Sequence, residues 1–318
     1  MVKGLGRPYY LAKFIPIRYK RKHFVVYGLP AIVSALESST IAEVNVMDGN
    51  GWIVDDQRPA TPGYKKVKYN DAMQSIKNVL NYLKIDTANH KLQITFSGDL
   101  VAASGVGASA AQCTSLARAL NNTFNLNLDD EQINNAAYEG EKAYHGTPSG
   151  IDNTASTFGG LIWFQKNLNG KKNAINLLKS PIKIPLVIGN TGITASTTEV
   201  IADVRKLKNE NPKKINKIFN NYEDLVQKAK DALLRGKIKE IGSLMNLNHK
   251  LLQQINVSGD INDQLVQTAL NNGATGAKMT GTGRGGLIIA LADNVKVQDQ
   301  IYNSIVNEGF TAWKTKIG

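Results

Sequence analysis

A glycine-rich segment in the first half of the chain has the residue types that phosphate binding requires. Residues 104–111 read Ser-Gly-Val-Gly-Ala-Ser-Ala-Ala. Glycines and small side chains let a ligand approach the backbone, and the first amides of a helix attract an anion. The spacing matches neither a Walker A motif, because no Gly-Lys pair follows, nor a dinucleotide motif, because its third glycine is missing. The segment predicts a phosphate-binding loop or, as the alternative, a tightly packed strand-to-helix turn.

A second segment carries groups suited to proton transfer. Residues 145–153 read His-Gly-Thr-Pro-Ser-Gly-Ile-Asp-Asn, and their glycines and proline favour a fixed turn. A carboxylate on a rigid loop can act as a general base, which makes Asp152 the candidate. Glu141, near the end of the preceding predicted helix, can point at the same space. The alternative for Asp152 is a structural role as a helix N-cap.

A third segment is a second glycine loop. Residues 280–286 read Thr-Gly-Thr-Gly-Arg-Gly-Gly and precede an apolar stretch at 287–291. So many glycines let the backbone bend closely around a ligand or a neighbouring loop. Taken alone, the segment is equally consistent with a glycine-rich hairpin.

Hydrophobic periodicity predicts the elements that must position these segments. Helical spacing predicts helices at 71–83 and 113–124, and a third from Asp129, a good N-cap, to about Tyr144, with Gly146 placed to end it. Strands or buried apolar segments are expected at 24–27, 31–36, 92–96 and 160–164. In the second half, helices are expected at 197–208, 214–234, 238–255 and 261–272, and strands at 286–290 and 311–314. Helices packed on one face of mixed or antiparallel sheets give an α+β fold.

Length and composition exclude several protein classes. The chain has 318 residues, which suggests two domains, and its single cysteine cannot form an internal disulfide, which excludes a disulfide-built secreted scaffold. No apolar run approaches the roughly 18 residues of a membrane-spanning helix, and no signal-peptide core precedes Lys13. We therefore expect a cytoplasmic protein without a membrane partner.

The formal net charge of +12 suits an anionic small molecule better than nucleic acid. A nucleic-acid surface would combine basic residues with exposed aromatic ones, and aromatic residues are only 7% of the chain. We therefore expect no nucleic-acid partner, whereas a nucleotide fits the charge. The polar stretch 165–180, which ends at Pro181, favours a boundary between domains at 1–175 and 176–318.

The three segments, in this order, resemble the three motifs of the GHMP kinases, the superfamily of galactokinase, homoserine kinase, mevalonate kinase and phosphomevalonate kinase. Further stretches are similar to the mevalonate kinase family, particularly its trypanosomatid form: 24–28, 55–60, 244–245 and 248–249. The resemblance covers the chain from about Ala12 onward. It implies a two-domain α+β fold with an N-terminal half like domain 2 of ribosomal protein S5, a ferredoxin-like C-terminal half, and the active site in the cleft between them.

The resemblance also implies an activity and roles for individual residues. The activity is transfer of a phosphoryl group from ATP, with Mg²⁺, to the 5-hydroxyl group of mevalonate in isoprenoid biosynthesis. Asp152 would be the general base, Lys13 would stabilise the transferring charge, and Ser109 and Glu141 would hold the metal ion. The implied phosphate contacts are Ser104, Gly105, Val106, Gly107, Ala108 and Ser109, and the implied substrate contacts are His23, Ser149, Thr197 and Gly283. Whether the enzyme is a homodimer is left open.

The first strand departs from the family pattern. Between Lys13 and His23, the segment 16–22 is longer than in the family, and Arg21-Lys22 replaces a Gly-Glu pair. A strand with an insertion must bulge, shift register or loop out. The extra positive charge would suit a phosphorylated acceptor, so a GHMP kinase for phosphomevalonate or another small alcohol is an alternative. A nucleotide-binding member with weakened catalysis is a second alternative.

Overall fold

In the computed structural model, contacts between residues divide the chain into two compact units. The first unit comprises Met1–Leu11 and Ala35–Gly159, and the second comprises Ala12–Ser34 and Gly160–Gly318. The structure describes residues 3–4, 12–15, 28–35, 38–102, 107–193, 197–281 and 283–318; at 3–4, 12–15, 197, 198 and 201 it describes the backbone alone. The division into domains 1–175 and 176–318 stays a prediction, as does the cleft between them.

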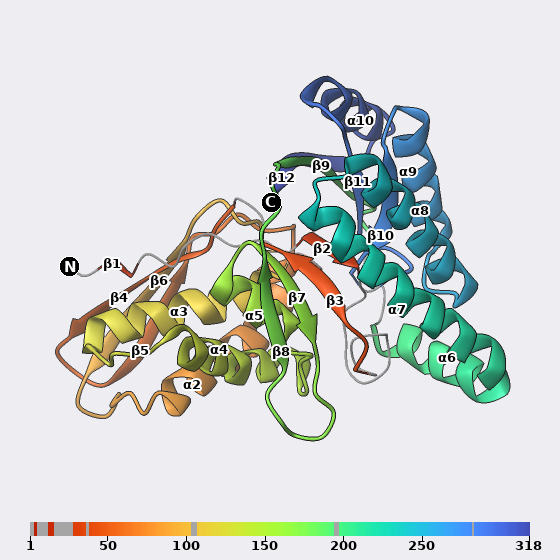
Figure 1. The fold of residues 1–318 in the computed structure, drawn as a ribbon. Coiled ribbons are helices and arrows are strands. Elements are labelled where there is room, and N and C mark those ends of the chain that lie inside the picture. The colour runs from red at the N-terminus through yellow and green to blue at the C-terminus, as the bar shows by residue number, and fades with distance from the viewer. Residues whose placement is uncertain are drawn as a thin grey trace. The chain divides into compact units, whose positions relative to one another are not determined.

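The first unit is a four-stranded sheet with helices packed against it (Figure 1). The strand order is β1-β4-β6-β5, and β5 and β6 run parallel, so they need the crossover that α1 and α2 supply. The strands are β1 Lys3–Gly4, β4 Ile41–Met47, β5 Gly51–Asp56 and β6 Lys91–Ser97. The helices are α1 Tyr64–Val67, α2 Tyr69–Tyr82, α3 Ala108–Phe124, α4 Asp130–His145 and α5 Ile151–Phe158.

One apolar core joins this sheet to α2, α3 and α4. Its buried side chains include Val44, Ile94 and Phe96 from the strands, Val79 from α2 and Leu116 from α3. Along β6 buried and half-buried residues alternate, as the sequence predicts for a strand with one covered face. The three helices therefore cover one face of the sheet.

The second unit holds two further four-stranded sheets, ordered β2-β3-β7-β8 and β10-β11-β9-β12, each antiparallel throughout. The strands are β2 Ala12–Ile15, β3 Ala31–Ser34, β7 Leu161–Gln165, β8 Ala174–Leu178, β9 Ile184–Asn190, β10 Gly276–Thr280, β11 Leu287–Leu291 and β12 Thr311–Ile317. The helices are α6 Thr197–Glu210, α7 Pro212–Leu234, α8 Ile238–Gln254, α9 Asp260–Asn271 and α10 Val295–Asn307. The buried Tyr222 of α7 donates a hydrogen bond to Pro30 O, 3.1 Å away, just before β3.

Most of the predicted helices are confirmed, whereas several strands are not foreseen by the sequence patterns. α4 has the predicted cap, because Asp129 and Gln132 form a capping box, and it ends at Gly146 as predicted. The patterns do not predict β4, β5, β8 and β9, and the segment 24–27 lies outside the described residues. The polar stretch 165–180 contains β8, which pairs with β7 as a hairpin. Within the described part of the chain, no helix combines the length and apolar character needed to cross a bilayer.

The first strand has an irregular register just before the segment in which the sequence predicts an insertion. In the pairing of β2 with β3, Lys13 lies opposite Val33 but Ile15 lies opposite Ile32, so the register shifts between them. Such a bulge accommodates an extra residue without displacing the rest of a strand. The segment 16–22 that follows lies outside the described residues.

We expect Gly140→Ala to destabilise the first unit, although alanine favours helix formation. A Cβ atom at position 140 of α4 would lie 2.7 Å from Cys113 Sγ and 2.8 Å from Val79 Cγ2. Overpacking costs about 1–3 kcal/mol, which exceeds the roughly 1 kcal/mol gained by replacing a helical glycine. Asn135→Ala, at an exposed position of the same helix, is the control and should be neutral or stabilising. Urea denaturation measures both, and a wild-type midpoint for Gly140→Ala would contradict the expectation.

We expect the second unit to lose stability as the pH falls from 6.5 toward 4. His249 is buried in α8; its Nδ1 accepts a hydrogen bond from Met279 N (3.4 Å), and its Nε2 lies 3.1 Å from Asp263 Oδ1. Burial lowers the pKa of His249 from 6.5 to about 4, with Lys278 acting in the same direction and Asp263 opposing it. In this window the unfolded chain binds a proton that the folded chain does not. Unfolding is therefore favoured by up to about 1.4 kcal/mol per pH unit.

Two histidine variants separate this effect from general acid sensitivity. His249→Gln should remove the loss of stability within that pH window, whereas His90→Gln, at an exposed position, should retain it. Denaturant titrations at several pH values measure the free energy of unfolding. An equal pH dependence in wild type and His249→Gln would show that another group is responsible.

Candidate active site

The N-terminal end of α3 has the geometry expected of a phosphate-binding turn. The helix follows Gly107, whose φ of 74° lies in the left-handed region that favours glycine. Ala108 and Ser109, which begin the helix, are buried. The first turn of a helix presents amides that have no partner within the helix, which suits an anion. Of the other predicted phosphate contacts, the segment 104–106 lies outside the described residues.

Three polar side chains meet at the end of α4. Ser109 Oγ lies 3.5 Å from His145 Nε2, and Glu141 Oε2 lies 3.5 Å from the same nitrogen. Glu141 and His145 are one helical turn apart, and only 1% and 15% of their side chains are exposed. The structure thus brings together Ser109 and Glu141, the two residues predicted to hold a metal ion. It also adds His145, for which the sequence predicts only a place in the following turn.

Asp152 lies in the first turn of α5 and is 4% exposed. The N-cap of this helix is Gly150, with a φ of 85°, so the alternative role of Asp152 as the cap is wrong. A carboxylate in the first turn is favourably placed toward the positive end of the helix dipole. α5 packs against both α3 and α4. The helix of the predicted base therefore touches the two helices that carry Ser109 and Glu141.

Buried hydrogen bonds fix α5 against α4. Asn153 Nδ2 donates to Asn134 Oδ1 at 2.7 Å and to Asn134 O at 3.1 Å, and Asn134 Nδ2 donates to Thr154 Oγ1 at 3.4 Å. The turn before α5 includes Ser149, a predicted substrate contact, whose Oγ accepts a hydrogen bond from the first amide of α5 at 3.4 Å. Because Asn153 and Thr154 directly follow Asp152, these buried bonds to α4 limit the positions open to Asp152.

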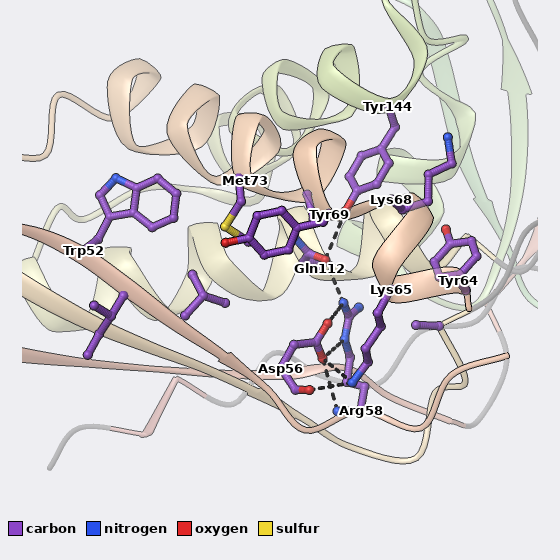
Figure 2. Close-up of a pocket in the computed structure, with 14 residues that line it drawn as sticks. Trp52, Asp56, Arg58, Tyr64, Lys65, Lys68, Tyr69, Met73, Gln112 and Tyr144 are labelled. Atoms are coloured by element: carbon purple, nitrogen blue, oxygen red, sulfur yellow. Dashed lines mark hydrogen bonds and ion pairs between the residues drawn. The ribbon is translucent and has the colours of Figure 1, made fainter. Parts of the chain in front are cut away.

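A cavity of about 630 Å³ lies beside the start of α3 and the end of α4 (Figure 2). Small-molecule sites typically enclose about 300–1,000 Å³. Aromatic rings of Trp52, Tyr64 and Tyr69 line it, and Lys65 and Lys68 add positive charge. The wall toward α3 and α4 is formed by Ala102, Gln112 and Tyr144. The sequence does not predict this cavity, although it does predict the phosphate-binding turn next to it.

In the second unit, a side chain of α9 and the backbone before that helix hold the glycine loop at residues 283–285. Asn262 donates a hydrogen bond to Gly285 O at 2.9 Å and accepts one from Gly285 N at 2.7 Å. A Cβ atom at Gly283, a predicted substrate contact, would lie 2.3 Å from Val257 O, and its φ of 93° also favours glycine. Close approach of two backbones therefore explains the glycine at 283 without a ligand, and its contact with substrate stays a prediction.

Arg284 connects this loop to α6. Its Nη1 lies 2.6 Å from Asp203 Oδ2, and its Nε donates to Asn256 O at 2.9 Å. Thr197, a predicted substrate contact, is the first residue of α6, and Lys13 is in β2; the structure describes the backbone alone at both. His23 lies outside the described residues. The roles of these three residues stay predictions.

Comparison with known proteins agrees with the motifs. The models for the GHMP kinases N terminal domain and the GHMP kinases C terminal match residues 72–160 and 229–311. A mevalonate kinase of Thermococcus sibiricus is 30% identical over 93% of this chain and 92% of its own length. One of Pyrococcus horikoshii is 32% identical over 85% of this chain and 84% of its own.

Solved structures give the same result. The crystal structure of L. major mevalonate kinase in complex with R-mevalonate is 38% identical, with a TM-score of 0.91, and the similarity covers 100% of this chain and 96% of that one. The predicted resemblance and the predicted α+β fold are confirmed by these matches. The chain belongs to the GHMP kinase superfamily and, within it, to the mevalonate kinase family.

Proposed function

We propose that this protein phosphorylates the 5-hydroxyl group of mevalonate with ATP and Mg²⁺. The observation that carries the proposal is the meeting of Ser109, in the phosphate-binding turn that begins α3, with Glu141 at the end of α4, where both lie 3.5 Å from His145 Nε2. GHMP kinases use ATP, and the solved relative that is 38% identical holds R-mevalonate. Family and site chemistry therefore support the same reaction.

The cavity and the start of α3 together fit a nucleotide. The aromatic rings of Trp52, Tyr64 and Tyr69 offer stacking surfaces for a purine, and Lys65 and Lys68 offer charge for phosphates. The cavity wall includes Gln112, one turn along α3 from Ser109. A base in the cavity would thus direct its phosphate chain toward the amides at residues 107–109.

The donor set at the end of α4 fits Mg²⁺. This ion prefers oxygen ligands and keeps several waters, so one hydroxyl and one carboxylate are sufficient from the protein. Ser109 Oγ and Glu141 Oε2 are of that kind, and Glu141 is almost fully buried. When bound, Mg²⁺ neutralises charge on the phosphate oxygens. We propose that these two residues hold it.

Asp152 is the proposed general base. An aliphatic alcohol is a poor nucleophile at neutral pH, and a fixed carboxylate can accept its proton as phosphoryl transfer proceeds. Asp152 is buried at the N-terminal turn of α5, which packs against α3 and α4. Lys13 is proposed to stabilise the transferring charge, and Ser149, Thr197, Gly283 and His23 are proposed to contact the acceptor. Location in the cytoplasm and oligomeric state remain predictions.

A panel of acceptors tests the proposed reaction. ADP release should be fastest with mevalonate, and slow or absent with phosphomevalonate and galactose. A preference for a phosphorylated acceptor would instead support the alternative that Arg21-Lys22 suggests. ATP binding without turnover on any acceptor would support the nucleotide-binding alternative. A coupled assay with saturating MgATP, with binding of ATP measured separately, distinguishes these results.

Asp152→Asn should abolish most turnover while leaving nucleotide binding nearly intact. Loss of a general base lowers kcat by about 10²–10⁴-fold, and the amide keeps the size of the side chain. Asp48→Asn, at an exposed turn, is the matched control and should have wild-type kcat. Initial rates give kcat, and calorimetry gives the Kd for ATP. If Asp152→Asn turns over at the wild-type rate, Asp152 is not the base.

A further inference from the structure

The guanidinium of Arg58 lies between the cavity and the start of α3. Arg58 Nε and Nη2 donate to the two carboxylate oxygens of Asp56 at 2.9 and 2.7 Å, which is a two-pronged ion pair. Nη1 donates to Ala108 O at 3.4 Å, and Nη2 donates to Gln112 Oε1 at 2.7 Å. Arg58 is 5% exposed, and its guanidinium carbon lies 5.4 Å from the centre of the Phe96 ring. One side chain thus binds the end of β5 and the first two turns of α3.

Gln112 extends this connection to α4. Its Oε1 also accepts a hydrogen bond from Tyr144 OH at 3.2 Å. Burial raises the pKa of Tyr144 well above its ordinary value, so the phenol remains a donor. Tyr144 precedes His145 and lies one turn from Glu141. Figure 2 shows the resulting chain of contacts from Asp56 through Arg58 and Gln112 to Tyr144.

The two charged groups in this chain of contacts, Asp56 and Arg58, neutralise each other and so stabilise it. Burial alone would raise the pKa of Asp56, but the hydrogen bonds and charge of Arg58, with Lys65 beside it, lower that pKa below its ordinary value. Asp56 is therefore ionised at neutral pH and neutralises the guanidinium. A lysine at position 58 would keep the positive charge but lose the bidentate geometry. Its single ammonium group cannot form two parallel hydrogen bonds with the carboxylate and also reach α3.

We propose that Arg58 is a positioning residue that holds the cavity in register with the start of α3, so that the base and the phosphates of one nucleotide can bind at the same time. The proposal rests on the nucleotide site of the proposed function. Two linked binding sites give high affinity only when their spacing matches the linked ligand. Arg58 sets that spacing, because it directly contacts both Asp56 at the end of β5, which lines the cavity, and Ala108 in the phosphate-binding turn.

The test compares ATP with its two halves. In Arg58→Lys, the Kd for ATP should rise by at least about tenfold, because the gain from linking the halves is lost. The Kd values for adenosine and for tripolyphosphate, measured by competition with a fluorescent nucleotide, should stay within about threefold of wild type, since each binds only one end. The KM for ATP should rise in parallel, with the KM for mevalonate unchanged.

Two further variants make the result decisive. Gln112→Met removes the shared acceptor at similar volume and should give the same pattern, which keeps the test valid if Arg58→Lys does not fold. Arg118→Lys is the matched control: Arg118, also on α3, bonds to Asp130 and Thr157 O but not to the first turn. It should leave the ratio of ATP affinity to fragment affinity unchanged.

The outcomes separate this proposal from the function on which it rests. If Arg58→Lys weakens ATP, adenosine and tripolyphosphate equally, or leaves ATP binding unchanged, Arg58 does not position the two ends. If the ratio of ATP affinity to fragment affinity fell as much in Arg118→Lys as in Arg58→Lys, the cause would be a general loosening of the fold. That result would also overturn the proposal. If wild type binds no ATP at all, the proposed kinase function itself fails.

Discussion

The burial on all sides of the first part of α3, residues 108–117, is the constraint on which the first unit depends. Ala110, Ala117 and Leu120 are fully buried, and so are Ser109 and Gln112 to within a few per cent. A helix can be buried on all sides only if neighbouring elements pack closely against it. The small side chains along α3 allow this close packing. The consequence is electrostatic as well as steric. The residues at the positive end of the α3 dipole are buried. An anion gains more free energy from the dipole in such a setting than in water, because water screens the interaction.

The same constraint governs the buried polar side chains of α3, α4 and α5. Burying polar side chains is costly unless they are paired, so they are found where they pair with one another or serve a ligand. Asn134, Asn153 and Thr154 pair among themselves and fix α5. Ser109, Glu141 and Asp152, proposed to bind the metal ion and to accept the proton, lie in the first turn of α3, near the end of α4 and in the first turn of α5. The polar side chains that hold α5 against α4 and those proposed to act on a ligand thus belong to the same three helices.

Sequence patterns predict the parts of this site that a local signal marks. The cap at Asp129 and the stop at Gly146 mark α4, and the glycine at 107 marks the start of α3, because each reflects backbone geometry within a few residues. The cavity has no such signal. Its walls come from β5, α1, α2, α3 and α4, and the sequence shows neither that β5 exists nor that it pairs parallel with β6. Gln112 offers one clue, since it is the one long polar side chain among the small residues 108–113 and such a side chain needs a partner when buried.

In the second unit, the glycine loop shows why a motif does not by itself identify a ligand contact. A Cβ atom would lie 2.3 Å from Val257 O at Gly283 and 2.7 Å from Ile193 O at Gly285, so packing alone accounts for two of the glycines. Arg284 differs, because it adopts a φ of 51° that costs a non-glycine residue about 1–3 kcal/mol. That cost is offset by its bonds to Asn256 and to Asp203 of α6. Arg284 therefore joins the loop to α6 through a strained backbone, and a glycine there would relieve the strain but lose the connection.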